Sequence, residues 1–399
     1  MIKKCLIASL LILILFPTPS LAYFGAKYEP ADGRIYHGLG QYVTFFYSDE
    51  ENWQYVNEYQ QGAEKSPIIY TAYYSINPKF DEFPYSTVSV NPNLADLINN
   101  HEYPYVILLG IAYLDIDATL AEIIGGNISM DDYYVNAAAV INGEWDSKIR
   151  ALAQEIQQMG VPFLLRPGWE FGQGNSGVHQ MGSSDFKDCW AHIQAIFIQE
   201  EVNNVAWVWN TVNPDQFNYL DYYPGDNQVD WWGINYFTTS QMSVGDGFLQ
   251  AAVDHQKPVL IGESSPIHNG GTTNSANWNS WFVPYFNKIR NFNNIKAFVY
   301  ISDPWDKAGF WNDWPDSRIS SNEFIRQNYA AEMNSLIYIH MSEYLANPEV
   351  INGETFNYQD VFKLLFNYGK NLTVEVGYLD LVEDSKLNGL DFGLIWLEK

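Results

Sequence analysis

Two glutamates, Glu170 and Glu263, have the residue type and the setting that acid–base chemistry requires. Glu170 stands in the run FLLRPGWEFG (163–172), and Glu263 stands in KPVLIGESSP (257–266). In each case a short apolar run of strand-forming residues stops, and the glutamate lies at or just past its carboxyl end. Functional groups occupy such positions in a (β/α)₈ barrel. Two carboxyl groups that face each other across a barrel mouth are suited to hydrolysis of a glycosidic bond.

The elements that would position these glutamates can be read along the chain. Parallel barrel strands are buried on both faces, so they appear as short and nearly continuous apolar runs. Most of the intervals between the runs are long enough for a helix and its loops, which parallel strands need. The sequence therefore predicts an α/β fold, a (β/α)₈ TIM barrel, in which Glu170 follows the fourth strand and Glu263 ends the seventh. Eight runs fit: 35–46, 67–75, 104–112, 161–166, 204–210, 229–236, 257–262 and 295–301.

Two of the intervening helices have clear signals. The segment ALAQEIQQMG (151–160) has a helical pattern that Gly160 closes, and Pro162 follows it. The segment 185–200 is a second helix, for which Ser183 and Ser184 are available as N-caps.

The chain divides into three predicted parts. Residues 1–22 have the pattern of a signal peptide, with Lys3 and Lys4 before an apolar stretch and small residues before a cut ahead of Tyr23. Residues 23–346 form the barrel. Residues 347–399 are a small C-terminal extension or β module, because LTVEVGYLD and LDFGLIWL resemble strands. We therefore expect a secreted protein, extracellular or periplasmic, without a membrane anchor, and a monomer.

Composition narrows the classes of partner. The formal net charge is −26, and cleavage after residue 22 would make it −28, so nucleic acid is not expected to bind. Cys189 would be the remaining cysteine, and its expected role is that of a small buried apolar residue. No Cys or His cluster has metal-ligand spacing, and no cofactor or metal is expected. Aromatic residues make up 16% of the chain, and tyrosine and tryptophan can stack on sugar rings while offering a polar group.

Three blocks of the sequence resemble those of a known family. They are RPGWEFG (166–172), YYPGDNQVDWWGINYF (222–237) and KPVLIGES (257–264), and an early block, EPADGRIYHGLGQ (29–41), is similar to the start of such barrels. The resemblance is to glycoside hydrolase family 26 and its relatives in the retaining (β/α)₈ clan, over roughly residues 29–335. It implies endo-acting hydrolysis of a β-linked polysaccharide: β-mannan, with xylan and β-glucan as alternatives.

One residue departs from the family's pattern. Family 26 mannanases usually carry His immediately before the acid/base glutamate, and much of the clan carries Asn, whereas this chain has Trp169. A tryptophan can stack or donate one N–H but cannot accept a hydrogen bond. The departure leaves the glutamate chemistry in place and leaves the polysaccharide open.

The expected reaction is a double displacement. Glu263 attacks the anomeric carbon as a carboxylate, and Glu170 protonates the leaving oxygen and later takes a proton from water. The resemblance implies that Tyr236, at the end of the sixth strand, orients Glu263, although a buried aromatic role is equally open. Trp305, just past the eighth strand, resembles the clan's sugar-stacking tryptophan.

Other candidates lie near strand ends. The guanidinium of Arg166 could fix a carboxylate through a two-pronged bond. Trp209 and Asn210, at the end of the fifth strand, and Trp169 are candidates for walls of sugar subsites, and His37, Gln41 and Asp303 are weaker ones.

Two other classes of protein compete with this reading. A non-catalytic glycan-binding protein on the same scaffold would be favoured by loss of either glutamate, and both are present. Metal-dependent chemistry would need a ligand cluster at strand ends.

Overall fold

Eight parallel strands close into a barrel within residues 34–341. The computed structural model describes residues 24–40, 49–78, 106–116, 133–172, 181–307 and 314–346. Each strand pairs with the next, and the last pairs with the first, Tyr36 opposite Ala297, which closes the barrel. The strands are β1 (Ile35–Gly40), β2 (Ile69–Ser75), β3 (Val106–Ala112), β6 (Phe163–Pro167), β7 (Val205–Thr211), β8 (Trp231–Tyr236), β9 (Val259–Ser264) and β10 (Ile295–Ile301).

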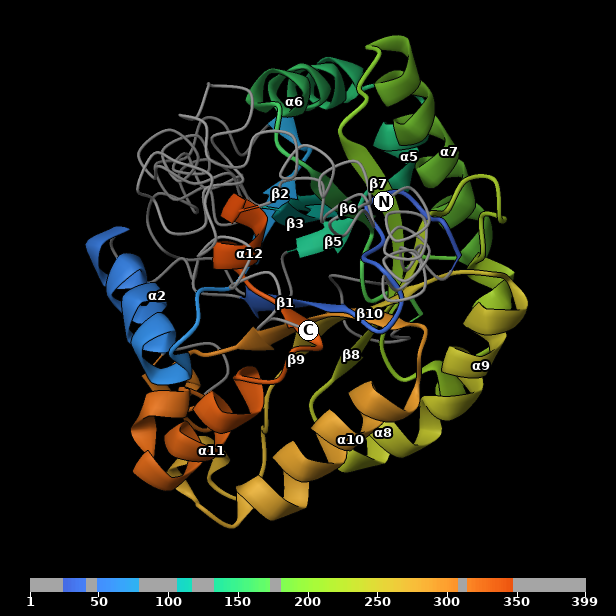
Figure 1. The fold of residues 1–399 in the computed structure, drawn as a ribbon. Helices are drawn as coiled ribbons and strands as arrows, with labels where there is room; N and C mark the ends of the chain where they lie inside the picture. The colour runs from blue at the N-terminus through green and yellow to red at the C-terminus, as the bar shows by residue number, and fades with distance from the viewer. Residues whose placement is uncertain are drawn as a thin grey trace, which may run out of the picture. The chain divides into compact units, whose positions relative to one another are not determined.

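Helices surround these strands (Figure 1). Those of the barrel unit are α2 (Asp49–Ala63), α5 (Ala137–Ile141), α6 (Asp146–Met159), α7 (Ser183–Gln199), α8 (Thr239–Val244), α9 (Asp246–Asp254), α10 (Val283–Asn291) and α11 (Glu323–Met333). Short helical turns are η3 (Pro214–Gln216), η4 (Tyr219–Tyr222), η5 (Gly271–Thr273), η6 (Trp278–Phe282), η7 (Trp305–Lys307) and η8 (Ile319–Ser321).

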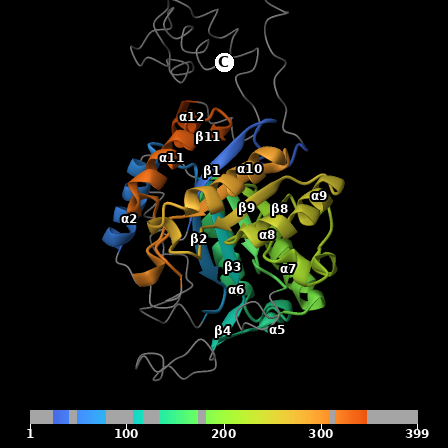
Figure 2. The ribbon, with the colours of Figure 1, turned by 90° about the horizontal axis from the view of Figure 1, so that it is seen from below.

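Three short strands are added to the eight strands of the barrel. The strands β4 (Leu114–Ile116) and β5 (Tyr133–Val135) form an antiparallel pair that continues beyond the carboxyl end of β3 (Figure 2). The strand β11 (Tyr338–Ile339) pairs with the start of β1, Ile35 opposite Tyr338.

The chain separates into two compact units. One is 34–341, and the other joins 1–33 to 342–399. The short helix α12 (Met341–Ala346) begins at the last residue of the first unit. The predicted signal segment 1–22 and the predicted extension 347–399 lie outside the described residues.

The predicted barrel is confirmed, and the reason is visible in the burial of its strands. Every residue of β1, β3, β6, β8, β9 and β10 is buried, because one face points into the barrel and the other packs against the helices. The predicted runs overlap all eight strands. The first run was expected to reach residue 46, whereas β1 ends at Gly40 and residues 41–48 lie outside the described part.

Both helices that the sequence predicts are present, but the predicted N-cap of the second one is wrong. Helix α6 ends at Gly160, which takes the left-handed conformation (φ 66°) that glycine adopts at little cost. Helix α7 is capped by Gly182, without a side-chain hydrogen bond. Ser183 and Ser184 are therefore the first residues of the helix and not its caps. Among the described helices, none is long and apolar enough to cross a bilayer.

Candidate active site

Glu170 lies in a strained turn directly after β6. Its φ is 58°, a left-handed conformation that is uncommon for a residue with a side chain. Its backbone N–H donates to the carbonyl of Asn210 at 2.8 Å, and Phe171 forms a bridge to Thr211, so the turn is held against the end of β7. Left-handed backbone outside glycine costs about 1–2 kcal/mol, and such strain concentrates at functional sites. The strained turn thus places the half-buried Glu170 side chain at the mouth of the barrel.

Glu263 is the fifth residue of β9 and is 3% exposed. The pairing of β8 with β9 shifts register before Asn235 and Glu263, and such a bulge changes the direction of a side chain. Two donors reach the same carboxylate oxygen. The Tyr73 hydroxyl donates to Oε1 at 2.9 Å, and Arg166 Nη1 donates to Oε1 at 3.0 Å.

A chain of side chains joins Arg166 to Glu170. Because a guanidinium only donates, its 2.8 Å bond to Asn210 Oδ1 fixes the orientation of that amide. Asn210 Nδ2 then donates to Asn235 Oδ1 at 3.2 Å, and Asn235 Nδ2 donates to Glu170 Oε1 at 2.8 Å. Arg166 is thus bonded to Glu263 directly and to Glu170 through two amides.

The two glutamates have different electrostatic surroundings. Burial raises the pKa of Glu170, which the Asn235 amide and the more distant Arg166 lower in part. Burial also raises the pKa of Glu263, against the opposing effect of Arg166, and repulsion by Glu170 adds to the rise. A cation and a hydroxyl are bonded to Glu263 and favour its ionised form, whereas the Asn235 amide that is bonded to Glu170 is neutral.

Trp169 and Tyr73 form an aromatic wall beside the glutamates. Their rings lie 5.1 Å apart between centroids, and the Arg166 guanidinium lies over both, 5.7 Å from the Tyr73 ring and 6.0 Å from the Trp169 ring. Gly110 on β3 makes the room, because a Cβ there would lie 2.9 Å from the Trp169 indole. The wall is half-buried, so it is open to a ligand.

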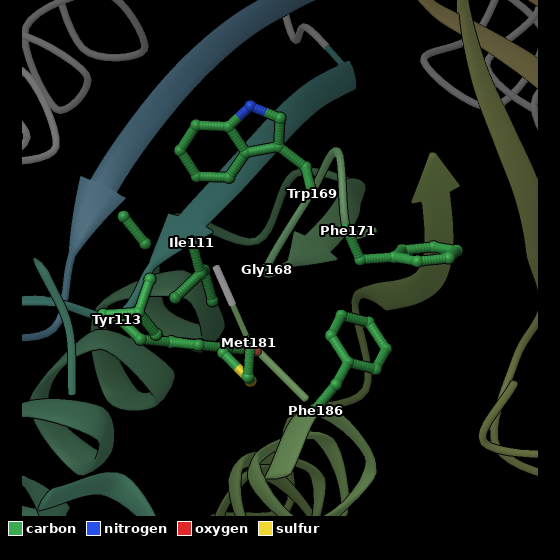
Figure 3. A pocket seen from close by; sticks show the side chains of 9 residues that line it. Ile111, Tyr113, Gly168, Trp169, Phe171, Met181 and Phe186 are labelled. Atoms are coloured by element: carbon green, nitrogen blue, oxygen red, sulfur yellow. The ribbon is translucent and has the colours of Figure 1, made fainter. Parts of the chain in front are cut away.

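A mostly apolar hollow lies next to Trp169 (Figure 3). Phe171 and Phe186 lie on one side of it and Tyr113 and Met181 on the other. The Tyr113 hydroxyl is buried and has no hydrogen-bond partner among the described residues. The hollow adjoins the turn that carries Glu170.

Two of the predicted site residues are not in the site. Asn235 points to Glu170, so the next residue on the strand, Tyr236, points out of the barrel, where its hydroxyl has no partner among the described residues. The hydrogen bonds to Glu263 among the described residues come from Tyr73 and Arg166, so the contacts do not support the expectation that Tyr236 orients it. The same alternation of side chains applies to β7. Asn210 points into the barrel, so its neighbour Trp209 lies on the outer face of the strand, where it is fully buried against Phe171 and Trp232. Trp209 is a core residue and not a subsite wall.

Trp305 follows the last barrel strand, as predicted, but its side chain is buried. It begins η7 after β10, is 1% exposed, and packs in an apolar cluster with Phe237 and Ile301. Trp314 meets its ring edge-on at 5.2 Å. A sugar could stack on Trp305 only if part of this cluster moved, so its substrate-binding role stays a prediction.

Among the weaker candidates, His37 is buried away from the glutamates in a bond to His340, and Gln41 lies outside the described residues. Asp303 is 1% exposed, and its carboxylate has no partner among the described residues. Cys189 is buried on α7, and burial raises the pKa of its thiol to about 12, as fits an inert residue. No group of acidic, His or Cys side chains in the described residues has the arrangement of a metal site.

Sequence reasoning missed Tyr73 and Asn235. Asn235 had a usable signal, because an amide inside the apolar run WWGINYF is buried and needs partners. Tyr73 had none, since it lies in a strand with two other tyrosines.

A closed parallel barrel with paired glutamates at the ends of its fourth and seventh strands has the architecture of (β/α)₈ glycoside hydrolases. Comparisons with known proteins agree. A sequence model of Glycosyl hydrolase family 26 matches residues 127–303, which include both glutamates. The β-1,3-xylanase TXYA of Vibrio sp. is 27% identical over 260 residues, which cover 57% of this chain and 54% of that protein. A β-1,3-xylanase of Alcaligenes sp. is 27% identical over 267 residues, covering 59% and 52%.

The chain thus spans about half the length of the curated relatives it matches. Among solved structures, a GH26 β-mannanase from Bacteroides ovatus has the same fold, with a TM-score of 0.55 at 15% identity over 78% of this chain and 91% of that one. Over residues 127–303 the chain is therefore similar to glycoside hydrolase family 26.

Proposed function

We propose that this protein is a retaining endo-β-glycanase. Glu263 attacks the anomeric carbon, the bond from that carbon to the leaving oxygen breaks, and Glu170 gives its proton to that oxygen. A water molecule then loses a proton to Glu170 and attacks the same carbon, and the bond to Glu263 breaks. Both starting groups are regenerated, and the product keeps the configuration of the substrate.

This proposal rests on the different hydrogen-bond partners of the two carboxyl groups. A nucleophile must be ionised, and Glu263 accepts hydrogen bonds from Arg166 and Tyr73 that favour the ionised form. A general acid must be protonated near the working pH, and Glu170 is desolvated and accepts from the neutral amide of Asn235.

Xylan is the substrate that we favour, and β-1,3-linked xylan first. Two curated relatives are named β-1,3-xylanases, whereas the likeness to mannanases comes from solved structures at about 15% identity. Trp169 supports this choice, because it replaces the histidine that the resemblance associates with mannan and offers an aromatic face beside Tyr73.

A substrate panel tests the proposal. The purified chain is incubated with β-1,3-xylan, β-1,4-xylan, β-mannan and mixed-linkage glucan, and the products are separated by size and analysed by NMR for anomeric configuration. We expect short oligosaccharides of retained configuration from β-1,3-xylan. Tight binding without turnover would instead indicate a glycan-binding protein, and an inverted product would remove Glu263 as nucleophile.

Secretion is a separate proposal that rests on the predicted signal segment 1–22. Expression of the whole chain, followed by determination of the amino terminus of the exported protein, should give Tyr23 as the first residue. Retention of the uncleaved chain in the cells would contradict it.

A further inference from the structure

We propose that Tyr73, on the second strand of the barrel, is the residue that positions the nucleophile Glu263. This inference rests on the proposed function, because it gives Tyr73 its role through Glu263. The resemblance assigns that role to a tyrosine at the end of the sixth strand, whereas the contacts place it on the opposite side of the mouth.

The first support is the oxygen that Tyr73 binds. Its hydroxyl and Arg166 Nη1 both donate to Oε1 of Glu263, at 2.9 and 3.0 Å. No described residue is hydrogen-bonded to the other oxygen, Oε2. A carboxylate held by one oxygen leaves the second to form the bond to the anomeric carbon, so the contacts assign Oε2 as the attacking atom.

The second support is that the Tyr73 ring is fixed in place. Trp169 packs against it with an angle of 49° between the rings, and the Arg166 guanidinium lies over its face. Gly110 on β3 adds a third contact, because a Cβ there would lie 3.0 Å from the ring. A ring with three such neighbours directs its hydroxyl to one point, which is what positioning a reactive group requires.

The third support is the position of Tyr236. Its hydroxyl is buried without a partner among the described residues, and it lies so near α8 that a Cβ on Gly245 would be 2.4 Å from it. The inward position at that level of β8 belongs to Asn235, which serves Glu170. The sixth strand therefore orients the acid/base, and the second strand orients the nucleophile.

A matched pair of variants tests this assignment. Tyr73→Phe keeps the ring and removes the hydroxyl that bonds Glu263, and Tyr236→Phe removes a hydroxyl that bonds nothing described. We expect Tyr73→Phe to lower kcat about 10- to 100-fold with little change in KM. Its pH profile should shift as well: the acid limb should move to higher pH, because ionised Glu263 has lost a donor. Tyr236→Phe should keep the wild-type kcat and pH profile, and 3-fluorotyrosine at position 73 should restore most of the activity.

A measurement without substrate separates this inference from the proposed function. In protein with ¹³C-labelled glutamate carboxyl groups, the signal that disappears in Glu263→Gln reports the titration of Glu263. That titration should move to higher pH in Tyr73→Phe and stay in place in Tyr236→Phe, whether or not any polysaccharide is cleaved.

The outcomes are distinguishable. An active wild type with unchanged kcat and unchanged Glu263 titration in Tyr73→Phe would overturn the inference and leave the glycanase proposal intact. A shifted titration in a protein that cleaves none of the polysaccharides would support the Tyr73–Glu263 link and count against the glycanase proposal. A kcat loss in Tyr236→Phe that matches Tyr73→Phe would return the role to the sixth strand.

Discussion

Asn235 donates a hydrogen bond of 2.8 Å to Glu170 and thereby ends a relay that begins at Arg166. The same guanidinium bonds Glu263 directly. One fully buried cation therefore fixes both carboxyl groups, but it is bonded directly to Glu263 and only through neutral amides to Glu170. This asymmetry is the physical basis for assigning opposite roles to two residues of the same type.

The role of each glutamate can be tested by removing it. Glu263→Ala should lose turnover, and azide should restore part of it by taking the place of the nucleophile. Glu170→Ala should lose most activity on polysaccharide and less on aryl glycosides with good leaving groups, because these need no proton. Rates on both kinds of substrate, with and without azide, decide the assignment, and near-normal cleavage of polysaccharide by either variant would refute it.

The coupling between the glutamates predicts a pH effect. Ionised Glu263 opposes the ionisation of its neighbour Glu170, so the neutral variant Glu263→Gln should lower the pKa of Glu170. In protein with ¹³C-labelled glutamate carboxyl groups, the signal that is absent from Glu170→Gln reports the titration of Glu170. That titration should lie at lower pH in Glu263→Gln than in wild type. A Glu170 titration that stays in place would show that the two groups do not interact.

Gly262 has to be glycine because Arg166 lies against it. A Cβ there would lie 2.9 Å from Arg166 Nη1 and 3.0 Å from the amide oxygens of Asn210 and Asn235. Gly262→Ala should therefore displace the guanidinium from Glu263 and reduce kcat about 100-fold. Gly247→Ala is the control, since nothing lies within 4 Å of the added atom. Equal activity of the two variants would mean that the site adapts without loss.

The strands and the two glutamates could be predicted from the sequence because both depend on short-range patterns. A strand buried on both faces is a continuous apolar run, and a glutamate that ends such a run stands out. The direction of each side chain is not encoded in that way. In β8, Trp232, Tyr236 and Asn235 are all buried, so the pattern does not tell which face points inward.

The choice of Tyr236 in place of Asn235, and the inclusion of Trp209 beside Asn210, follow from this gap. The register shift between β8 and β9 is a further long-range feature that no local pattern shows. The Tyr73–Glu263 bond joins residues 190 positions apart, and it depends on closure of the whole barrel.

A substitution of Trp305 can distinguish a sugar-binding role of its ring from a packing role. Its ring is buried in the cluster with Phe237, Ile301 and Trp314. If packing is its function, Trp305→Ala should cost about 3–5 kcal/mol of stability with little change in activity per folded molecule. If the ring also binds sugar, KM should rise and kcat should fall beyond what loss of folded protein explains. Melting temperature and kinetics measured on the same preparation distinguish the two.

A buried histidine pair predicts how stability depends on pH. His340 Nε2 bonds the carbonyl of Met333 at 2.8 Å, so it carries the proton and its Nδ1 is an acceptor. His37 Nδ1 must then donate across 3.0 Å to His340 Nδ1, which leaves His37 Nε2 to accept from Tyr59 at 2.6 Å. Every ring nitrogen is used in the neutral form, and a further proton would place a charge in a buried site.

Burial lowers the pKa of both rings, that of His340 to about 4. In the unfolded chain both rings bind protons near pH 6.5, so acidification favours unfolding. Stability should therefore fall between about pH 7.5 and pH 4, with His340 alone accounting for at most about 3 kcal/mol. Denaturant titrations across this range should give a shallower loss for His340→Asn, whose amide oxygen can still accept from His37, than for wild type. The exposed His268→Asn serves as the control, and parallel curves for His340→Asn and wild type would rule out the histidine pair as a source of acid sensitivity.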